Sequence, residues 1–224
     1  MALPLICDPA KAVPVAEYDV ACHQLQNASG AVPMKRLVLS MFVSLDGYIT
    51  GPGGAFVAPQ WSDDLEQHWS GYAMQRAGHF LYGRVNFQFN KGFWEPAAND
   101  PNAPAAAIPH AAMMNRMPKT VFSRRLSGDP GWNGTVASGD TTEVVRKLKA
   151  GGGEGDLFCF GGASLAQSLV SRDLVDEYRI MVTPNLFGDG VPLFKPGFPR
   201  QELKLLGSRS LDTGAVILHY ERKR

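Results

Sequence analysis

The sequence predicts an α/β fold in which a mainly parallel sheet is covered by helices on both faces and ends in an antiparallel hairpin. From residue 35 onward, short apolar segments typical of buried strands alternate with segments of helical periodicity. Glycines and helix-capping residues separate them. At the C-terminus, two alternating segments flank Asp212-Thr213-Gly214, a sequence typical of hairpin turns. Ligands on such sheets bind at the carboxyl ends of the strands.

The strands follow from apolar runs bounded by turn residues. The first covers residues 36–43 and is apolar on both faces, as expected of a strand buried inside a parallel sheet. The later strands are expected at 79–82, 119–123, 134–137, 156–160 and 178–183, with the hairpin at 202–210 and 215–222.

The helices are expected where a capping residue precedes a periodic segment. Ser62 is an N-cap for a helix that ends near Gln75, and Thr141 is an N-cap for a helix over 142–150. Shorter helices are expected from 85, over 111–116 and over 164–171, with a Gly- and Pro-rich loop at 50–59 and a Pro-, Ala- and Asn-rich loop at 95–109.

The composition indicates an ordinary globular domain in the cytoplasm. Apolar residues make up 45% and charged residues 19%, with a net charge of +1, so binding to nucleic acid or to a membrane surface is not expected. The three cysteines and five histidines match no metal-site or redox spacing, and we predict no metal. Cys159 lies in an apolar run and is predicted to be buried.

Residues 1–33 differ from the rest of the chain, because they show no sustained periodicity and end in the linker-like Asn27-Ala28-Ser29-Gly30. We expect a loosely ordered N-terminal extension there and a single domain over residues 34–224.

Three strand ends carry residues suited to phosphate. In Phe160-Gly161-Gly162-Ala163-Ser164, a strand passes through two glycines into a helix, so that backbone N–H groups can approach an anion. Gly83-Arg84 repeats this arrangement with a guanidinium group, and Asn86 follows. Ser123-Arg124-Arg125 places a hydroxyl and two guanidinium groups after a third strand, as a 2′-phosphate on a ribose requires. Alone, each segment is equally consistent with a tight turn or a solvated basic loop.

Acidic residues at two other positions are candidates for the substrate side. Asp46 ends the first strand, and Asp64 and Glu66 lie in the first turn of the next helix. A carboxyl group at a pocket edge can orient a ring N–H or help to deliver a proton. The alternatives are a turn residue for Asp46 and favourable helix-start electrostatics for the other two.

In their order and spacing, these segments resemble the reductase domain of the bacterial bifunctional riboflavin-biosynthesis deaminase/reductase and its stand-alone relatives. The resemblance covers residues 34–224, and the segments that carry it are Ser44-Leu45-Asp46-Gly47, Gly83-Arg84, Phe160-Gly161-Gly162, Leu174-Val175-Asp176-Glu177 and Thr183-Pro184-Asn185-Leu186-Phe187-Gly188-Asp189-Gly190. It implies a dihydrofolate-reductase-like three-layer fold. Asn86 stands where the family usually has threonine, and Tyr48 where a basic residue is common.

The resemblance also implies NADPH as the cofactor. Gly83, Arg84, Asn86, Ser123 and Arg124 would hold the adenosine phosphates, and the pyrophosphate would lie along Gly161, Gly162, Ala163, Ser164 and Leu165. The Gly161-Gly162 peptide is expected to be cis. Ile49 and the loop 50–54 would cover the nicotinamide, and Thr183 would support the substrate site.

The implied activity is hydride transfer from NADPH to a C=N bond. The substrate is either a pyrimidine ribosylamine of the riboflavin pathway or a pterin- or folate-like compound, and a homodimer is plausible. The alternatives are a non-catalytic module that binds NADPH or a pterin, and a structural or partner-binding domain whose glycine turns are architectural.

Overall fold

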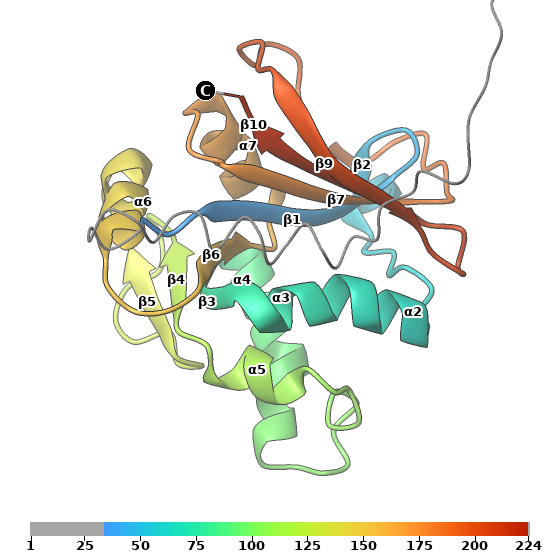
Figure 1. The fold of residues 1–224 in the computed structure, drawn as a ribbon. Helices are drawn as coiled ribbons and strands as arrows, with labels where there is room; N and C mark the ends of the chain where they lie inside the picture. Colours follow the sequence, from blue (N-terminus) through green and yellow to red (C-terminus); the bar gives the residue numbers. More distant parts are fainter. Residues whose placement is uncertain (1–33, 224) are drawn as a thin grey trace, which may run out of the picture. The chain divides into compact units, whose positions relative to one another are not determined.

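The computed structural model describes residues 34–223, so the expectation of a loose extension at residues 1–33 lies outside the described residues. An eight-stranded sheet runs through the domain (Figure 1). Its strand order is β5-β4-β3-β6-β1-β7-β10-β9. The strands are β1 (Leu37–Ser44), β3 (Ala77–Gly83), β4 (Lys119–Phe122), β5 (Gly134–Ala137), β6 (Asp156–Cys159), β7 (Glu177–Thr183), β9 (Leu203–Ser210) and β10 (Val216–Arg222).

The pairing confirms the predicted sheet. From β5 to β7 every neighbouring pair is parallel, and β7–β10 and β10–β9 are antiparallel. The β9–β10 pair is the expected hairpin. β1 lies inside the parallel part between β6 and β7, which explains why seven of its eight residues are buried.

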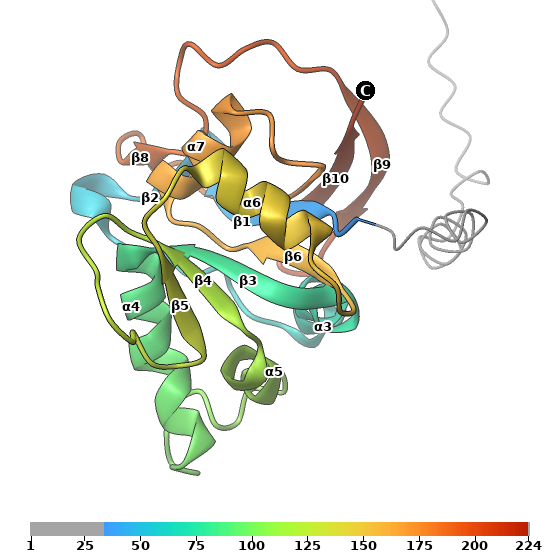
Figure 2. The same ribbon diagram turned by 90° about the vertical axis from the view of Figure 1, so that its left-hand side faces the viewer.

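The helices cover both faces of the sheet (Figure 2). On one face, α6 (Thr141–Ala150) and α7 (Ala163–Ser171) pack against the odd-numbered residues of β1, such as Leu37 and Leu39. On the other, α3 (Gly71–Arg76), α4 (Arg84–Trp94) and α5 (Ala111–Arg116) contribute to a core that includes Val38. Side chains alternate along a strand, so β1 serves both cores.

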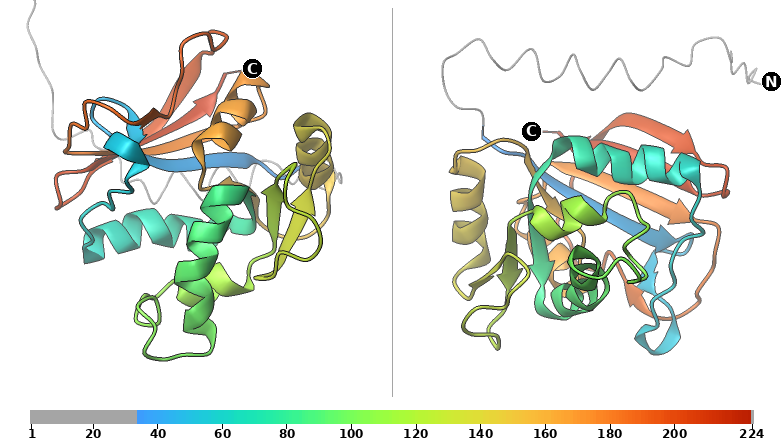
Figure 3. Two further views of the ribbon diagram at one scale, coloured as in Figure 1. Left: turned by 180° about the vertical axis from the view of Figure 1, so that it is seen from behind. Right: turned by 90° about the horizontal axis from the view of Figure 1, so that it is seen from below.

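The predicted helix 62–75 forms as one continuous run of α2 (Asp63–Leu65), a π-helical segment (Glu66–Ser70) and α3, and it lies across β1, β7 and β10 (Figure 3). Its Leu65 and Trp69 pack against Met181 of β7 and Ile217 of β10. The Ser62 cap is confirmed, since its hydroxyl accepts a hydrogen bond from the Leu65 N–H at 3.1 Å. Cys159 is fully buried, as expected.

One local prediction needs correction, and one pair of short strands was missed. The N-cap of α6 is Asp140 and not Thr141, because the Asp140 carboxylate accepts the N–H groups of Thr142 and Glu143 at 2.9 and 3.1 Å. The short pair β2 (Tyr48–Thr50) and β8 (Val191–Pro192) was not predicted. Elements of two and three residues have too little periodicity to be recognised in sequence, and 3₁₀ turns at Pro52–Gly54 and Glu95–Ala98 lie in the predicted loops.

Candidate functional site

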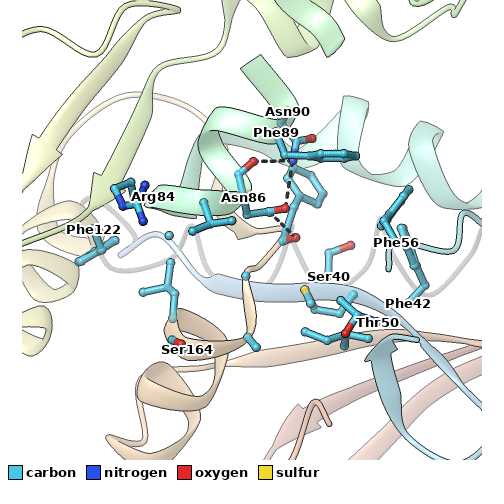
Figure 4. A pocket seen from close by; sticks show the side chains of 18 of the residues that line it. Ser40, Phe42, Thr50, Phe56, Arg84, Asn86, Phe89, Asn90, Phe122 and Ser164 are labelled. Carbon is cyan, nitrogen blue, oxygen red and sulfur yellow. Dashed lines mark hydrogen bonds between the residues drawn. The ribbon is translucent and has the colours of Figure 1, made fainter. Parts of the chain in front are cut away.

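A cleft of about 1390 Å³ opens at the carboxyl ends of β3, β4 and β6. All three predicted phosphate segments line it, although they come from different parts of the sequence. In Figure 4, Arg84, Phe122 and Ser164 lie at one end, and Ser40, Phe42, Thr50 and Phe56 at the other. We call these the basic end and the aromatic end of the cleft. Asn86 and Asn90 of α4 lie between them, and Phe89 of the same helix contacts Phe56 at the aromatic end.

The two glycine turns meet at the basic end. The Gly161–Gly162 peptide is cis, as the resemblance implied. The Gly83 N–H donates a hydrogen bond to the Gly161 carbonyl at 3.2 Å, which ties the end of β3 to the end of β6. Gly161 has φ +108°, and a Cβ there would stand 3.1 Å from the Met41 methyl carbon. This position therefore requires glycine for both its backbone conformation and its space.

The helices that follow these turns begin without a side-chain cap. The N-caps are Gly83 for α4 and Gly162 for α7, and within the described residues neither helix has a side-chain capping hydrogen bond. Both N-termini line the cleft. Helix N-termini carry unsatisfied donors and a partial positive charge, so the pair favours an anion between them.

Three arginines line the cleft at the basic end: Arg84, Arg124 and Arg172. None forms an ion pair with a carboxylate within residues 34–223. Arg84 donates to Gln88 at 2.9 Å and Arg172 to the Ser168 hydroxyl at 2.6 Å. The Ser123 hydroxyl oxygen accepts the N–H groups of Arg125 and Leu126, which shapes the turn after β4. Uncompensated guanidinium groups beside two helix N-termini fit a ligand with more than one phosphate.

The aromatic end is lined by rings in mutual contact. The Phe42 ring centroid lies 5.9 Å from that of Phe56, and the Phe56 centroid lies 5.2 Å from that of Phe89. Phe42 also contacts Trp69 at 6.4 Å. Phe56 and Phe89 are about half exposed, so their faces remain open to a ligand.

Glu66 fixes two further rings at the aromatic end. Its carboxylate accepts from the Trp61 indole N–H at 3.1 Å and contacts His110 Nδ1 at 2.9 Å. The Trp61 and His110 rings are stacked at 5.8 Å, and Trp94 packs on His110 at 4.9 Å. Trp61, Trp94 and His110 line the cleft, whereas Glu66 supports them from behind.

Residues 35–217 match the family model of the RibD C-terminal domain. The chain belongs to this family. Its relatives include the uncharacterized protein YyaP of Bacillus subtilis strain 168, 29% identical over 83% of this chain and 94% of that protein. A second is YwjB of the same organism, 26% identical over 84% of this chain and 98% of that one.

Solved structures share the fold. A putative riboflavin biosynthesis protein from Shewanella sp. PV-4 aligns with a TM-score of 0.65 at 24% identity, over 85% of this chain and all of the other. RibD of Acinetobacter baumannii aligns with a TM-score of 0.58 at 15% identity, over 86% of this chain and 59% of the other. The dihydrofolate-reductase-like fold of RibD reductase domains is thus the fold of this chain, as predicted.

Most of the predicted cofactor residues line the cleft: Ile49, Gly83, Arg84, Asn86, Ser123, Arg124, Gly162, Ala163, Ser164 and Leu165. Gly161 lies directly behind Gly162. The Asn86 side chain is already engaged, because its Nδ2 donates to the Phe160 carbonyl at 3.1 Å and its Oδ1 accepts from Asn90 at 3.2 Å (Figure 4). Asn86 therefore holds the strand end before the glycine pair against α4.

Asp46 and Asp64 do not line the cleft. Asp46 accepts the Ser44 hydroxyl at 2.5 Å and the N–H groups of Phe187 and Gly188, and the serine bond holds its pKa below the usual value. Asp64 pairs with Arg209 at 2.8 Å, which lowers its pKa likewise. Both carboxylates act as hydrogen-bond acceptors that fasten loops.

Thr183 also lies outside the cleft lining, and its buried hydroxyl donates to the Val43 carbonyl at 3.1 Å. It joins the ends of β1 and β7 behind the site. Conversely, Arg172 and the rings of Phe42, Phe56, Phe89, Trp94 and His110 line the cleft but were not predicted. Arg172 follows α7 and belongs to no motif. His110 follows the predicted loop 95–109, and no sequence pattern indicates its contact with Glu66.

Within residues 34–223, no group of three or more His, Cys, Asp or Glu side chains is placed to hold a metal ion. None of the helices described there is long and apolar enough to cross a membrane.

Proposed function

We propose that this chain is an NADPH-dependent reductase that reduces a C=N bond of a heterocyclic compound. The observation that carries the proposal is the basic end of the cleft, where two uncapped helix N-termini and three arginines that pair with no carboxylate of residues 34–223 surround a glycine pair. Membership in a reductase-like family supports it.

The residues present fit the cofactor. The first N–H groups of α7, from Gly162 to Ser164, would bind the pyrophosphate, with those of α4 opposite. Arg84, Ser123 and Arg124 would bind the phosphate that distinguishes NADPH from NADH. When bound, the cofactor supplies the hydride. The chain binds, orients and shields the reactants between the rings of the aromatic end.

The proton that completes the reduction has two sources in this proposal. Asp46 and Asp64 are held ionised and lie outside the cleft, so they do not deliver it. Water in the open cleft is one source. His110 is the other, since it lines the cleft while Glu66 occupies its Nδ1. Asp46, Asp64 and Thr183 then serve as positioning residues that fasten the site from outside.

A thermal-shift comparison of NADPH and NADH tests cofactor binding, and substrate-dependent oxidation of NADPH tests catalysis. We expect stabilisation by NADPH in preference to NADH, and oxidation with either the pyrimidine ribosylamine or a dihydropterin. Stabilisation without oxidation on any such compound would support the non-catalytic alternative. The absence of stabilisation by either nucleotide would contradict the proposal.

The homodimer remains part of the proposal. β9 is the edge strand of the sheet, and its Leu203 and Leu205 side chains are 37% and 52% exposed. An exposed edge with apolar residues is suited to pairing with a second copy. Light scattering after size exclusion should give twice the mass of the chain, and a monomer would contradict this part.

A further inference from the structure

We propose that the aromatic end of the cleft accepts a flat, uncharged ring without a phosphate group, such as a free pterin, and disfavours a sugar phosphate. The inference rests on the proposed reductase function, because it assigns the substrate class of the same cleft. It follows from where the cleft places its rings and where it places its charges.

The rings form a continuous apolar wall suited to stacking. Phe42, Phe56 and Phe89 form a row of rings in mutual contact along one side of the aromatic end (Figure 4). Stacking of a flat heterocycle on such rings stabilises binding and does not need a charge on the ligand. A ribose phosphate gains nothing comparable from these surfaces.

The cations of the cleft are gathered at the other end. Among the described residues that line the cleft, the only lysines or arginines are Arg84, Arg124 and Arg172, and none belongs to the aromatic end. The described residues thus offer three guanidinium groups to the cofactor phosphates and no lysine or arginine to a phosphate on the substrate.

The polar groups at the aromatic end favour a neutral ligand as well. The Glu66 carboxylate stands directly behind Trp61 and His110. A phosphate placed here would lose hydration against aromatic surface and approach a carboxylate. His110 and the Ser40 and Ser70 hydroxyls, which also line the cleft, can bond the edge of a neutral ring.

Calorimetric titration of the full chain, at saturating NADP⁺ and again without it, tests the inference. The ligands are 7,8-dihydropterin and 5-amino-6-ribosylaminouracil with and without its 5′-phosphate. We expect the pterin to bind best, and the phosphate to weaken binding of the uracil compound by at least about tenfold, since about 1.4 kcal/mol corresponds to that factor. Tighter binding of the phosphorylated form, or equal binding of the two forms, would overturn the inference.

A pair of matched variants locates the ligand. Phe56→Ala should weaken pterin binding by about tenfold through lost stacking. Phe194→Ala is the control, because Phe194 is 48% exposed against 50% for Phe56 but lies outside the cleft lining. Equal effects of the two variants would contradict the inference. Because the titration without NADP⁺ needs neither cofactor nor turnover, failure of the proposed reductase activity would be seen separately in the NADPH assays.

Discussion

At the amino ends of β1, β6 and β7 every buried acid is paired, whereas at the carboxyl ends of β3, β4 and β6 the charged groups face an open cleft. Glu177, 1% exposed, contacts Arg36 at 2.8 Å, Arg76 at 2.9 Å and His219 at 2.7 Å. Asp156 and Asp176 accept the N–H groups of Arg36 and Leu37 and pair with Arg76 and Lys149.

The cleft differs from this network in the sign of its charged groups and in their lack of ion-pair partners within residues 34–223. Its arginines have no carboxylate partners in the described part of the chain, and two of its helices begin without a cap. In the network, the charged side chains are buried against partners of opposite charge, so removing one of them should cost stability. In the cleft, the arginines have no such partners among the described residues and are available to a ligand. Substitutions in the network should therefore affect stability, and substitutions in the cleft should affect binding.

The largest expected effect concerns the Glu177 network at the amino ends of β1, β6 and β7. Glu177→Gln removes the negative charge shared by two arginines and a histidine and leaves the buried Arg76 and His219 with a neutral partner, so we expect a loss of about 3–5 kcal/mol in the free energy of unfolding. Urea unfolding measures this. The affinity for NADPH of the folded variant should stay unchanged. A stability loss below about 1 kcal/mol would show that the network is not fully desolvated.

The same network makes stability depend on pH. Hydrogen bonds from His219 and Arg76 outweigh burial and hold the pKa of Glu177 well below its ordinary value of 4.5. Its contribution is therefore complete above pH 4.5 and is lost as the pH falls further towards the folded-state pKa. Urea unfolding between pH 7 and pH 3 should bring the wild type and Glu177→Gln closer together. Parallel curves would argue against this assignment.

At the basic end of the cleft, Arg124→Ala should reduce the preference for NADPH over NADH by about ten- to a hundredfold. A hydrogen bond to a charged group is worth about 1.5–3 kcal/mol. Arg125→Ala is the matched control, because Arg125 adjoins Arg124 but does not line the cleft. Dissociation constants for both nucleotides measure the ratio. If the two variants behaved alike, the effect would be one of general charge.

Gly83→Ala should weaken NADPH binding several-fold while stability changes by less than about 1 kcal/mol. The added methyl group would stand 3.7 Å from the Gly162 amide nitrogen, an ordinary contact within the protein that crowds the start of α7. Gly92→Ala, inside the helix that Gly83 precedes, meets none of the described atoms outside its own stretch of helix within 4 Å and provides the control. NADPH binding that is unaffected by Gly83→Ala would place the pyrophosphate elsewhere.

The smallest effect concerns α6, whose N-terminus also lines the cleft but is closed by its own acid. Asp140→Ala should cost about 1 kcal/mol of stability through the lost cap, measured by urea unfolding. NADPH binding should be unchanged or slightly tighter, because a carboxylate leaves the rim of the cleft. Weaker NADPH binding would contradict the division between capped and uncapped helices.

Features that depend on residues close together in the chain could be predicted from the sequence. The strands, the Ser62 cap and the glycine turns follow from neighbouring residues, and the topology then brings the turns together at one edge of the sheet. Contacts between residues far apart in the chain produce no recognisable pattern in the sequence and could not be predicted. Glu66 meets His110 at a separation of 44 residues, and Asp64 meets Arg209 at 145. An acid at a helix start therefore looks the same in sequence whether it faces a ligand or fastens a hairpin.

The most direct measurement is a crystal structure of the chain with NADPH. The account predicts the pyrophosphate against the N–H groups of Gly162 to Ser164, and the ribose phosphate beside Ser123 and Arg124. A cofactor bound elsewhere, or a basic end closed by protein side chains in crystals soaked with NADPH, would contradict it.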